Sequence, residues 1–474
     1  MRPSPSLLSL VFRLHFLLAF GLASPLGAAA EKLNVLFLAT DDWRPEIGCY
    51  GTPGMVTPNV DKLAAHGVLF SRAYCQFPLC NPSRTSMLTS HYPTVTGVLD
   101  NETAFRDAHP EWVTLPQLFK EHGYFVARTG KIFHGGIDDP KAWTEVGDSR
   151  VPAGRGLKDQ PPPRPAGKTK GQNPAHSDRI VVMDGDGEDH PDFYTAAQGI
   201  GFLEKHKDEP FFIAVGFVKP HSPPTAPQKF FDLHDPAKIA LPPDFAPRPA
   251  APPGFPAASI NARNGDLFIA RDATPDEARK MIQAYRASAS WTDWNVGRVL
   301  DALDRLGLAE KTIVVFFGDH GYHLGEKGKW SKHGSLYEVG ARVPLIVRLP
   351  GTGGNGRACG RTVQFVDVYP TLAELCGLTP PPGLDGRSFA ALLRDPQAAW
   401  PHPAFTVAKV AGGVARAVRT ERWRYAEYPG PGGGAMLFDH DADPHEMKNL
   451  ADDPAQAAVV AELQTLLQHL PAKP

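Results

Sequence analysis

The chain has 474 residues, of which 42% are hydrophobic and 21% charged, and its formal net charge is -2. Acidic and basic residues are nearly balanced, which argues against bulk nucleic-acid binding and against a polybasic patch for a membrane surface. This length allows a sizeable core, and we expect a globular protein with two domains.

The N-terminus has the pattern of an export signal. Arg2 precedes an apolar stretch at about residues 14–22, and Ala28–Ala30 offers a cleavage site of small residues. A membrane anchor is the alternative, but the apolar stretch is too short to favour one. We therefore expect a signal peptide at residues 1–30, export to the periplasm or secretion, and no stable membrane insertion.

Short apolar runs alternate with helix-like segments along most of the chain, which is the pattern of a mainly parallel sheet flanked by helices. The clearest helix begins with a capping box at Thr274–Glu277, with Pro275 at the first helical position. The predicted elements are, in chain order, a strand at 33–39, a helix and turn at 60–70, a helix at 115–122, strands at 124–128 and 211–217, the helix from Thr274, and a strand at 312–317.

The pattern changes towards the C-terminus. Short strand-like pieces at 413–420 and 423–427 precede a helix at 454–470, which predicts a smaller α+β part. We expect a larger α/β domain at residues 31–375 and a C-terminal subdomain at 376–474.

Two stretches rich in Pro, Gly and charge lie at residues 151–178 and 235–262. Such composition predicts surface loops rather than core.

The chain has five cysteines, at positions 49, 75, 80, 359 and 376. Without Cys80, four remain, and these allow three pairings in an oxidising compartment. Their number neither requires nor forbids a disulfide, and no spacing resembles that of a zinc site.

Reactive polar residues follow four of the predicted strands. These residues are Asp41 and Asp42 after the strand at 33–39, Lys131 and His134 after 124–128, His221 after 211–217, and Asp319 and His320 after 312–317. Each of them alone is commonly a turn residue, a cap or a solvated side chain. Because open parallel sheets bind ligands at the carboxyl ends of their strands, we expect all of them to converge on one site.

Three of these residues, Asp41, Asp42 and Asp319, are carboxylates. Carboxylate oxygens are hard ligands that suit Ca²⁺ or Mg²⁺ rather than zinc. We therefore expect one divalent cation, with Ca²⁺ favoured over Mg²⁺, which would offset the charge of a bound anion.

Cys80 opens a string, Cys-Asn-Pro-Ser-Arg, that also has the features of a helix start. Pro82 suits the first turn, and Ser83 and Thr85 suit N-terminal positions. Cys80 and Arg84 would then lie beside free backbone N–H groups and the positive end of a helix dipole, where an anion binds. A buried hydrophobic cysteine is the alternative, and the polar residues at the strand ends make it the weaker interpretation.

The string Cys-x-Pro-x-Arg at residues 80–84 resembles the signature of the type I sulfatases, which depend on formylglycine and have an alkaline-phosphatase-like fold. Further strings resemble this family and occur in family order: Thr40–Pro45, Thr129–Lys131, Lys219–His221, Asp319–Gly321, and the tail from Leu437 to Leu450. Several are similar in particular to the subgroup of iduronate 2-sulfatase and its bacterial relatives. His320 is a trait of that subgroup, because sulfatases generally have Asn or Gln after this aspartate.

The resemblance implies that a formylglycine-generating enzyme oxidises Cys80 to an aldehyde, whose hydrate is the nucleophile. It places Asp41, Asp42, Asp319, His320 and residue 80 itself at the metal ion. Imidazole is a poor match for Ca²⁺, so His320 either ligates weakly or hydrogen-bonds the sulfate.

The resemblance also implies roles for the remaining polar residues. Arg84 or Lys131 supports the nucleophile, and Lys131 and Lys332 hold sulfate oxygens as point charges. His221 is the candidate general acid for the departing sugar oxygen, and His134 is the candidate base for release of sulfate. The predicted catalytic residues are therefore Cys80, Arg84, Lys131, His134, His221 and Lys332.

The expected function is hydrolysis of a sulfate ester on a sugar, with the 2-O-sulfate of iduronate or a similar uronic acid in a glycosaminoglycan or other polysaccharide favoured. One alternative is exo- or endo-action on another sulfated carbohydrate. Another is a phosphatase or phosphodiesterase of the same fold, although the chain lacks the extra Asp/His ligands of such enzymes in family order. The third is a non-catalytic glycan-binding relative, which would be expected to lack Cys80 or Arg84.

Overall fold

The computed structural model describes residues 32–152 and 178–471. The predicted signal peptide at 1–30 and most of the stretch at 151–178 lie outside the described residues. Leu33–Pro474 form one compact unit. Among the described residues, no helix combines the length and the apolar character that are needed to cross a membrane.

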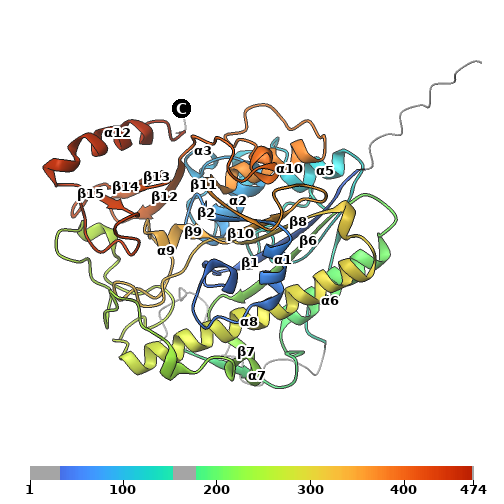
Figure 1. The fold of residues 1–474 in the computed structure, drawn as a ribbon, viewed down its shortest axis with the longest axis horizontal. Coiled ribbons are helices and arrows are strands. Elements are labelled where there is room, and N and C mark those ends of the chain that lie inside the picture. Colours follow the sequence, from blue (N-terminus) through green and yellow to red (C-terminus); the bar gives the residue numbers. More distant parts are fainter. Residues whose placement is uncertain (1–31, 153–177, 472–474) are drawn as a thin grey trace, which may run out of the picture. The chain divides into compact units, whose positions relative to one another are not determined.

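The main sheet occupies the centre of this unit (Figure 1). Its strands are β1 (Asn34–Asp41), β2 (Val68–Tyr74), β3 (Phe125–Gly130), β4 (Glu145–Val146), β6 (Phe211–Pro220), β8 (Thr312–Gly318), β9 (Arg342–Val343), β10 (Leu345–Arg348) and β11 (Arg357–Gln364). Within the described chain the strand order is β11-β2-β10-β8-β1-β6-β3-β4, and β9 pairs with β2. β10 is antiparallel to both of its neighbours and β9 to β2, whereas the other pairs are parallel. The predicted mainly parallel sheet is confirmed.

The helices are α1 (Pro58–Ala65), α2 (Cys80–Thr89), α3 (Pro93–Thr96), α4 (Phe105–Ala108), α5 (Leu115–Glu121), α6 (Pro191–Lys205), α7 (Gln228–Phe231), α8 (Pro275–Arg305), α9 (Glu338–Ala341), α10 (Val368–Leu375), α11 (Ala390–Arg394) and α12 (Ala457–Leu467). α8 starts with the predicted capping box, in which Thr274 and Glu277 exchange hydrogen bonds. The prediction at 60–70 was wrong for its last residues. The helix ends at Ala65, and Val68–Phe70 begin β2 instead, where they pair with β10 and β11.

The side chains of β1 pack against helices on both faces of the sheet. All eight of its residues are buried, as expected for a parallel strand with helices on either side. Because side chains alternate along a strand, Val35 and Phe37 face the core formed with α2, α5 and α10. Leu36 and Leu38 face the core formed with α1, α6 and α8.

A smaller antiparallel sheet lies near the C-terminus, and its order is β12-β13-β14-β15. Its strands are β12 (Ala404–Val410), β13 (Gly413–Arg419), β14 (Trp423–Tyr428) and β15 (Gly434–Asp439). Leu463 and Leu467 of α12 pack on its apolar face. The predicted smaller α+β part is therefore present, while a domain boundary near residue 375 stays a prediction. A two-stranded sheet of β5 (Val181–Met183) and β7 (Thr225–Pro227) completes the strands of the described residues.

All five cysteines and the second Pro-rich stretch lie within the described residues. Cys49, Cys75, Cys80, Cys359 and Cys376 are all free thiols. Residues 235–262 form loops with short 3₁₀ turns and are largely exposed or half-buried.

Candidate active site

The four strands with polar residues at their ends are neighbours in the sheet. β8, β1, β6 and β3 follow one another and run parallel. Their carboxyl ends therefore meet at one edge, although the strands lie far apart in the sequence. The structure brings the predicted side chains together at this edge, next to the start of α2.

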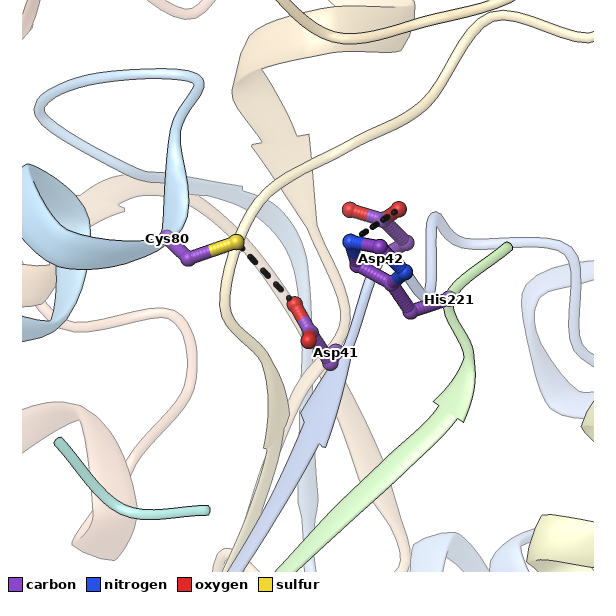
Figure 2. A group of neighbouring side chains, drawn as sticks. All are labelled: Asp41, Asp42, Cys80 and His221. Carbon is purple, nitrogen blue, oxygen red and sulfur yellow. Dashed lines mark hydrogen bonds and ion pairs between the residues drawn. The ribbon is translucent and has the colours of Figure 1, made fainter. Parts of the chain in front are cut away.

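Cys80 is the first residue of α2 and is only 2% exposed. Its Sγ lies 3.3 Å from Oδ1 of Asp41 and 3.3 Å from Nε2 of His320. Figure 2 shows the Cys80 and Asp41 side chains pointing toward each other. Burial and Asp41 raise the pKa of the thiol, but Lys131 and Lys332 outweigh them, so the pKa lies below its ordinary value.

Two glycines set the position of Lys131. Gly130 has a φ of 67°, in the left-handed region that favours glycine. A Cβ on Gly216 would lie 2.0 Å from the Lys131 carbonyl oxygen. The backbone N–H of Lys131 also donates to the Gly216 carbonyl at 2.7 Å. β3 and β6 can therefore approach closely where the chain turns towards the site.

Asp41 lies between Cys80 and Lys131. Its Oδ1 faces the thiol, and its Oδ2 forms an ion pair with the Lys131 ammonium. Burial alone would raise the pKa of Asp41. The charges of Lys131, His221, Arg84 and Lys332 instead hold that pKa well below its usual range.

Asp42 is held in an uncommon backbone conformation, with a φ of 62°. Its N–H donates to Oδ1 of Asp319 at 3.1 Å, and its carbonyl accepts from the Tyr285 hydroxyl at 2.7 Å. Lys332 Nζ lies 2.8 Å from its carboxylate, and His221 Nε2 lies 3.7 Å from it (Figure 2). Burial raises the pKa of Asp42 to about 7 despite the charge of Lys332.

Arg84 is buried and connects three parts of the site. Its Nε donates to Oδ2 of Asp319 at 2.8 Å. Its other nitrogens donate to the carbonyls of Lys131, Ile132 and Thr40. The guanidinium thus ties the ends of β1 and β3 to the residue that follows β8.

His320 has a defined orientation. Its Nδ1 donates to the Gly321 carbonyl at 3.0 Å, which leaves Nε2 facing the Cys80 sulfur. Burial would lower the pKa of this imidazole, but Asp319 and the Cys80 thiolate raise it to about 9.

His134 and His221 have different neighbours. His221 Nδ1 donates to the Ser222 carbonyl at 2.7 Å, so its Nε2 is the nitrogen directed at Asp42. His134 lines a cavity of about 620 Å³ together with Lys131 and Asp192. Burial, and then the charge of Lys131, lower the pKa of His134 to about 4.

The donors of the cluster fit a divalent cation. Within the described residues, Asp41, Cys80, Asp319 and His320 each offer a ligand atom, and these atoms lie within 4.8 Å of one another. Asp42 belongs to an overlapping group of the same kind with Asp41, Cys80 and His221. Three buried carboxylates, one of them with a raised pKa, suit a hard cation such as Ca²⁺ or Mg²⁺.

Sequence reasoning missed several residues that hold the site. Ser83 lies in the first turn of α2, as predicted, and its hydroxyl also donates to the Asp319 carbonyl at 2.5 Å. The hydroxyl of Tyr285, on α8, donates to the Asp42 carbonyl at 2.7 Å. Asp192 accepts hydrogen bonds from the backbone N–H groups of Val218 and Lys219, just before His221. No sequence motif marks these contacts, because each joins segments that lie far apart in the chain or in different elements.

Comparisons with known proteins identify the family of the chain. Residues 33–378 match the family model described as Sulfatase, and residues 325–473 match the model described as N-sulphoglucosamine sulphohydrolase, C-terminal. The chain is 35% identical over 415 residues to iduronate 2-sulfatase of Homo sapiens, which covers 78% of this chain and 74% of that protein. It is 32% identical over 462 residues to a sulfatase of Formosa agariphila, which covers 92% of this chain and 86% of that protein.

Solved structures confirm the fold. A phosphonate monoester hydrolase of Agrobacterium radiobacter superposes with a TM-score of 0.74 at 22% identity, over 93% of this chain and 95% of that one. At this identity the likeness concerns the fold alone. The sulfatase family model, by contrast, covers most of the chain. This protein therefore belongs to the sulfatase family and is a sulfatase enzyme, as the strings around Cys80 predicted.

Proposed function

We propose that the protein removes a sulfate ester from a sugar, and that its substrate is the 2-O-sulfate of iduronate or of a similar uronic acid in a glycosaminoglycan or other polysaccharide. The proposal is supported by the 35% identity to iduronate 2-sulfatase and by the Asp319–His320 pair at the end of β8. The observation that carries it is the convergence of four parallel strand ends on Cys80.

Cys80 is proposed to act after oxidation to formylglycine. An aldehyde hydrate at this position supplies a nucleophilic hydroxyl and a second hydroxyl, and the second one allows sulfate to be released without attack by water on sulfur. The proposed cation, Ca²⁺ in preference to Mg²⁺, would be held by Asp41, Asp42, Asp319 and His320. When bound, it would neutralise and polarise a sulfate oxygen.

Lys131 and Lys332 are proposed to bind the sulfate oxygens. Both ammonium groups lie at the site, where they form ion pairs with Asp41 and Asp42. Burial would lower their pKa values, but the adjacent carboxylates raise them. Both lysines therefore remain charged, and fixed positive charges stabilise the transition state of sulfuryl transfer. Arg84 is proposed to hold these charged residues in position through its hydrogen bonds to Asp319 and to the Lys131 carbonyl.

The two histidines are proposed to move protons. His134 has a lowered pKa, so it is neutral at physiological pH and suits the role of base in sulfate release. His221 directs Nε2 into the site, and this nitrogen is proposed to protonate the departing sugar oxygen.

The cellular setting follows from the same proposal. We expect an exported enzyme of the periplasm or the medium that meets a formylglycine-generating enzyme during maturation and a sulfated saccharide afterwards. The described residues offer no helix that could anchor it in a membrane.

A panel of defined sulfated saccharides tests the substrate. It should contain uronates sulfated at O2, hexosamines sulfated at O6 or N2, and a phosphate monoester matched to the best sulfate. We expect the highest kcat/KM on the uronate 2-O-sulfate. Preference for a hexosamine sulfate would contradict the uronate specificity while keeping the sulfatase activity.

A further inference from the structure

Four side chains with sulfur, nitrogen and oxygen donors meet at one point when Cys80 is still a thiol. Cys80 Sγ lies 3.3 Å from both Asp41 Oδ1 and His320 Nε2. His320 Nε2 lies 3.5 Å from Oδ1 of Asp319. All four side chains are buried, and one ligand atom from each lies within 4.8 Å of the others.

Three of the six separations among these four atoms are close to the edges of a tetrahedron around zinc, and the other three are within 4.8 Å. Protein Zn²⁺ is four-coordinate, with bonds of about 2.3 Å to sulfur and about 2.0–2.2 Å to nitrogen and oxygen. A tetrahedron with such bonds has edges of roughly 3.3–3.7 Å. The measured separations of 3.3, 3.3 and 3.5 Å fall in this range.

The ligand atoms are also oriented by other groups. The Gly321 carbonyl accepts from Nδ1 of His320 and so turns Nε2 towards the sulfur. Lys131 holds the second oxygen of Asp41, and Arg84 holds the second oxygen of Asp319. Such outer partners fix the direction of metal ligands and are typical of zinc sites.

We propose that the unconverted chain binds one Zn²⁺ through Cys80 Sγ, His320 Nε2 and one oxygen each of Asp41 and Asp319. On binding, the proton that Cys80 and His320 share passes to solvent, so that the thiolate and the unprotonated Nε2 become ligands. Oxidation of Cys80 removes the sulfur donor and leaves mainly oxygen donors, which moves the preference of the site to a hard cation. This inference concerns the chain before oxidation, so it does not depend on the proposed function.

Cobalt provides a direct readout of the sulfur ligand. The full chain is produced without conversion of Cys80, the intact thiol is verified by peptide mass, and metal is removed with a chelator. Titration with Co²⁺ should give the visible bands of a tetrahedral site and a near-ultraviolet band of sulfur-to-cobalt charge transfer, with a stoichiometry of one. Added Zn²⁺ should bleach these bands by displacement, whereas Ca²⁺ should not.

Substitutions test whether Cys80 and His320, rather than another residue, are the zinc ligands. Cys80→Ser should lose the charge-transfer band and bind Zn²⁺ more weakly. Removal of a group that only orients a metal ligand costs about 10–100-fold in affinity, so loss of the sulfur ligand itself should cost at least this much. His320→Gln should also weaken Zn²⁺ binding but keep the charge-transfer band. Cys376→Ser is the matched control and should keep both band and affinity. Cobalt bands without charge transfer, or unchanged Zn²⁺ affinity in Cys80→Ser, would overturn the proposal.

Discussion

The hydroxyl of Ser222 donates a hydrogen bond of 2.5 Å to Oδ1 of Asp266. Ser222 directly follows His221, and the second oxygen of Asp266 accepts from the Tyr322 hydroxyl at 2.9 Å. Tyr322 lies two residues beyond His320. One buried carboxylate therefore connects the loop after β6, which carries the proposed acid, with the loop after β8, which carries the proposed metal ligands.

Removal of this connection should slow catalysis more than it weakens binding. We expect Asp266→Ala to lower kcat by roughly 10–100-fold with a smaller change in KM, because a misplacement of about 1 Å in an active site can cost about 100-fold. Steady-state kinetics on a sulfated sugar measures kcat and KM separately. Asp272→Asn, at an exposed aspartate of the neighbouring loop, is the control. A kcat of Asp266→Ala equal to that of the control would contradict a positioning role.

The residue-80 proposal predicts a defined peptide mass. Active protein should yield a peptide around residues 80–84 in which the thiol has been replaced by an aldehyde. An active preparation with only intact thiol at residue 80 would refute the mechanism. Cys80→Ser should fold and lose essentially all activity, while Cys359→Ser, at a buried cysteine outside the site, should retain it.

The metal proposal predicts that chelation abolishes the activity of the converted enzyme and that Ca²⁺ or Mg²⁺ restores it. Asp41→Asn and Asp319→Asn should raise the Ca²⁺ concentration needed for half-maximal activity, because each removes a charged ligand. Asp304→Asn, at a surface ion pair with Lys62, should not. Restoration by zinc alone, or two bound ions per chain, would instead indicate phosphatase-like metal chemistry.

The apolar runs were sufficient to predict the central strands. β1, β6 and β8 are continuous buried runs, and parallel pairing then places Asp41, His221 and Asp319 at the same edge. Val68–Phe70 were not recognised as a strand because three apolar residues after a helix have no distinct period. Their partners in β10 and β11 lie more than 270 residues later in the chain.

The supporting contacts of the site could not be predicted. Helical spacing indicates that Tyr285 is buried, but its hydroxyl donates to the Asp42 carbonyl, 243 residues away in the sequence. Asp266 lies in the segment before α8, where no sequence motif marks it. Long-range pairs of this kind depend on the final packing, so the motifs identify the reactive groups and the structure alone identifies what holds them.

Buried His323 predicts a pH dependence of stability. Burial, together with the charges of Lys329 and Lys327, holds its pKa well below the ordinary value. The unfolded chain takes up a proton here near pH 6.5 and the folded chain does not. Acidification below about pH 6.5 therefore favours unfolding through this group, by up to about 1.4 kcal/mol per pH unit.

Chemical denaturation between pH 7 and pH 5 measures this effect. His323 Nε2 lies 2.6 Å from the Ser335 hydroxyl. His323→Gln keeps a group that can hydrogen-bond Ser335 but does not titrate, so its free energy of unfolding should fall less steeply on acidification than that of the wild type. His445→Gln, at an exposed histidine, is the control and should keep the wild-type slope. An unchanged slope in His323→Gln would show that His323 takes up its proton equally in both states.

The last prediction separates the roles of the two histidines. Nε2 of His221 lies in the site, 3.7 Å from Asp42 (Figure 2). Its Nδ1 donates to the Ser222 carbonyl. If Nε2 protonates the sugar oxygen, His221→Ala should lower kcat on the order of 10²–10⁴-fold on a sugar sulfate. The loss should be much smaller on an activated aryl sulfate, because its phenolate leaves without a proton. His134→Ala should instead impair release of sulfate, so that a sulfated residue 80 accumulates and is detected by mass. Equal losses on both substrates for His221→Ala would show that this imidazole binds sulfate, and the acid would then be His134 or His320.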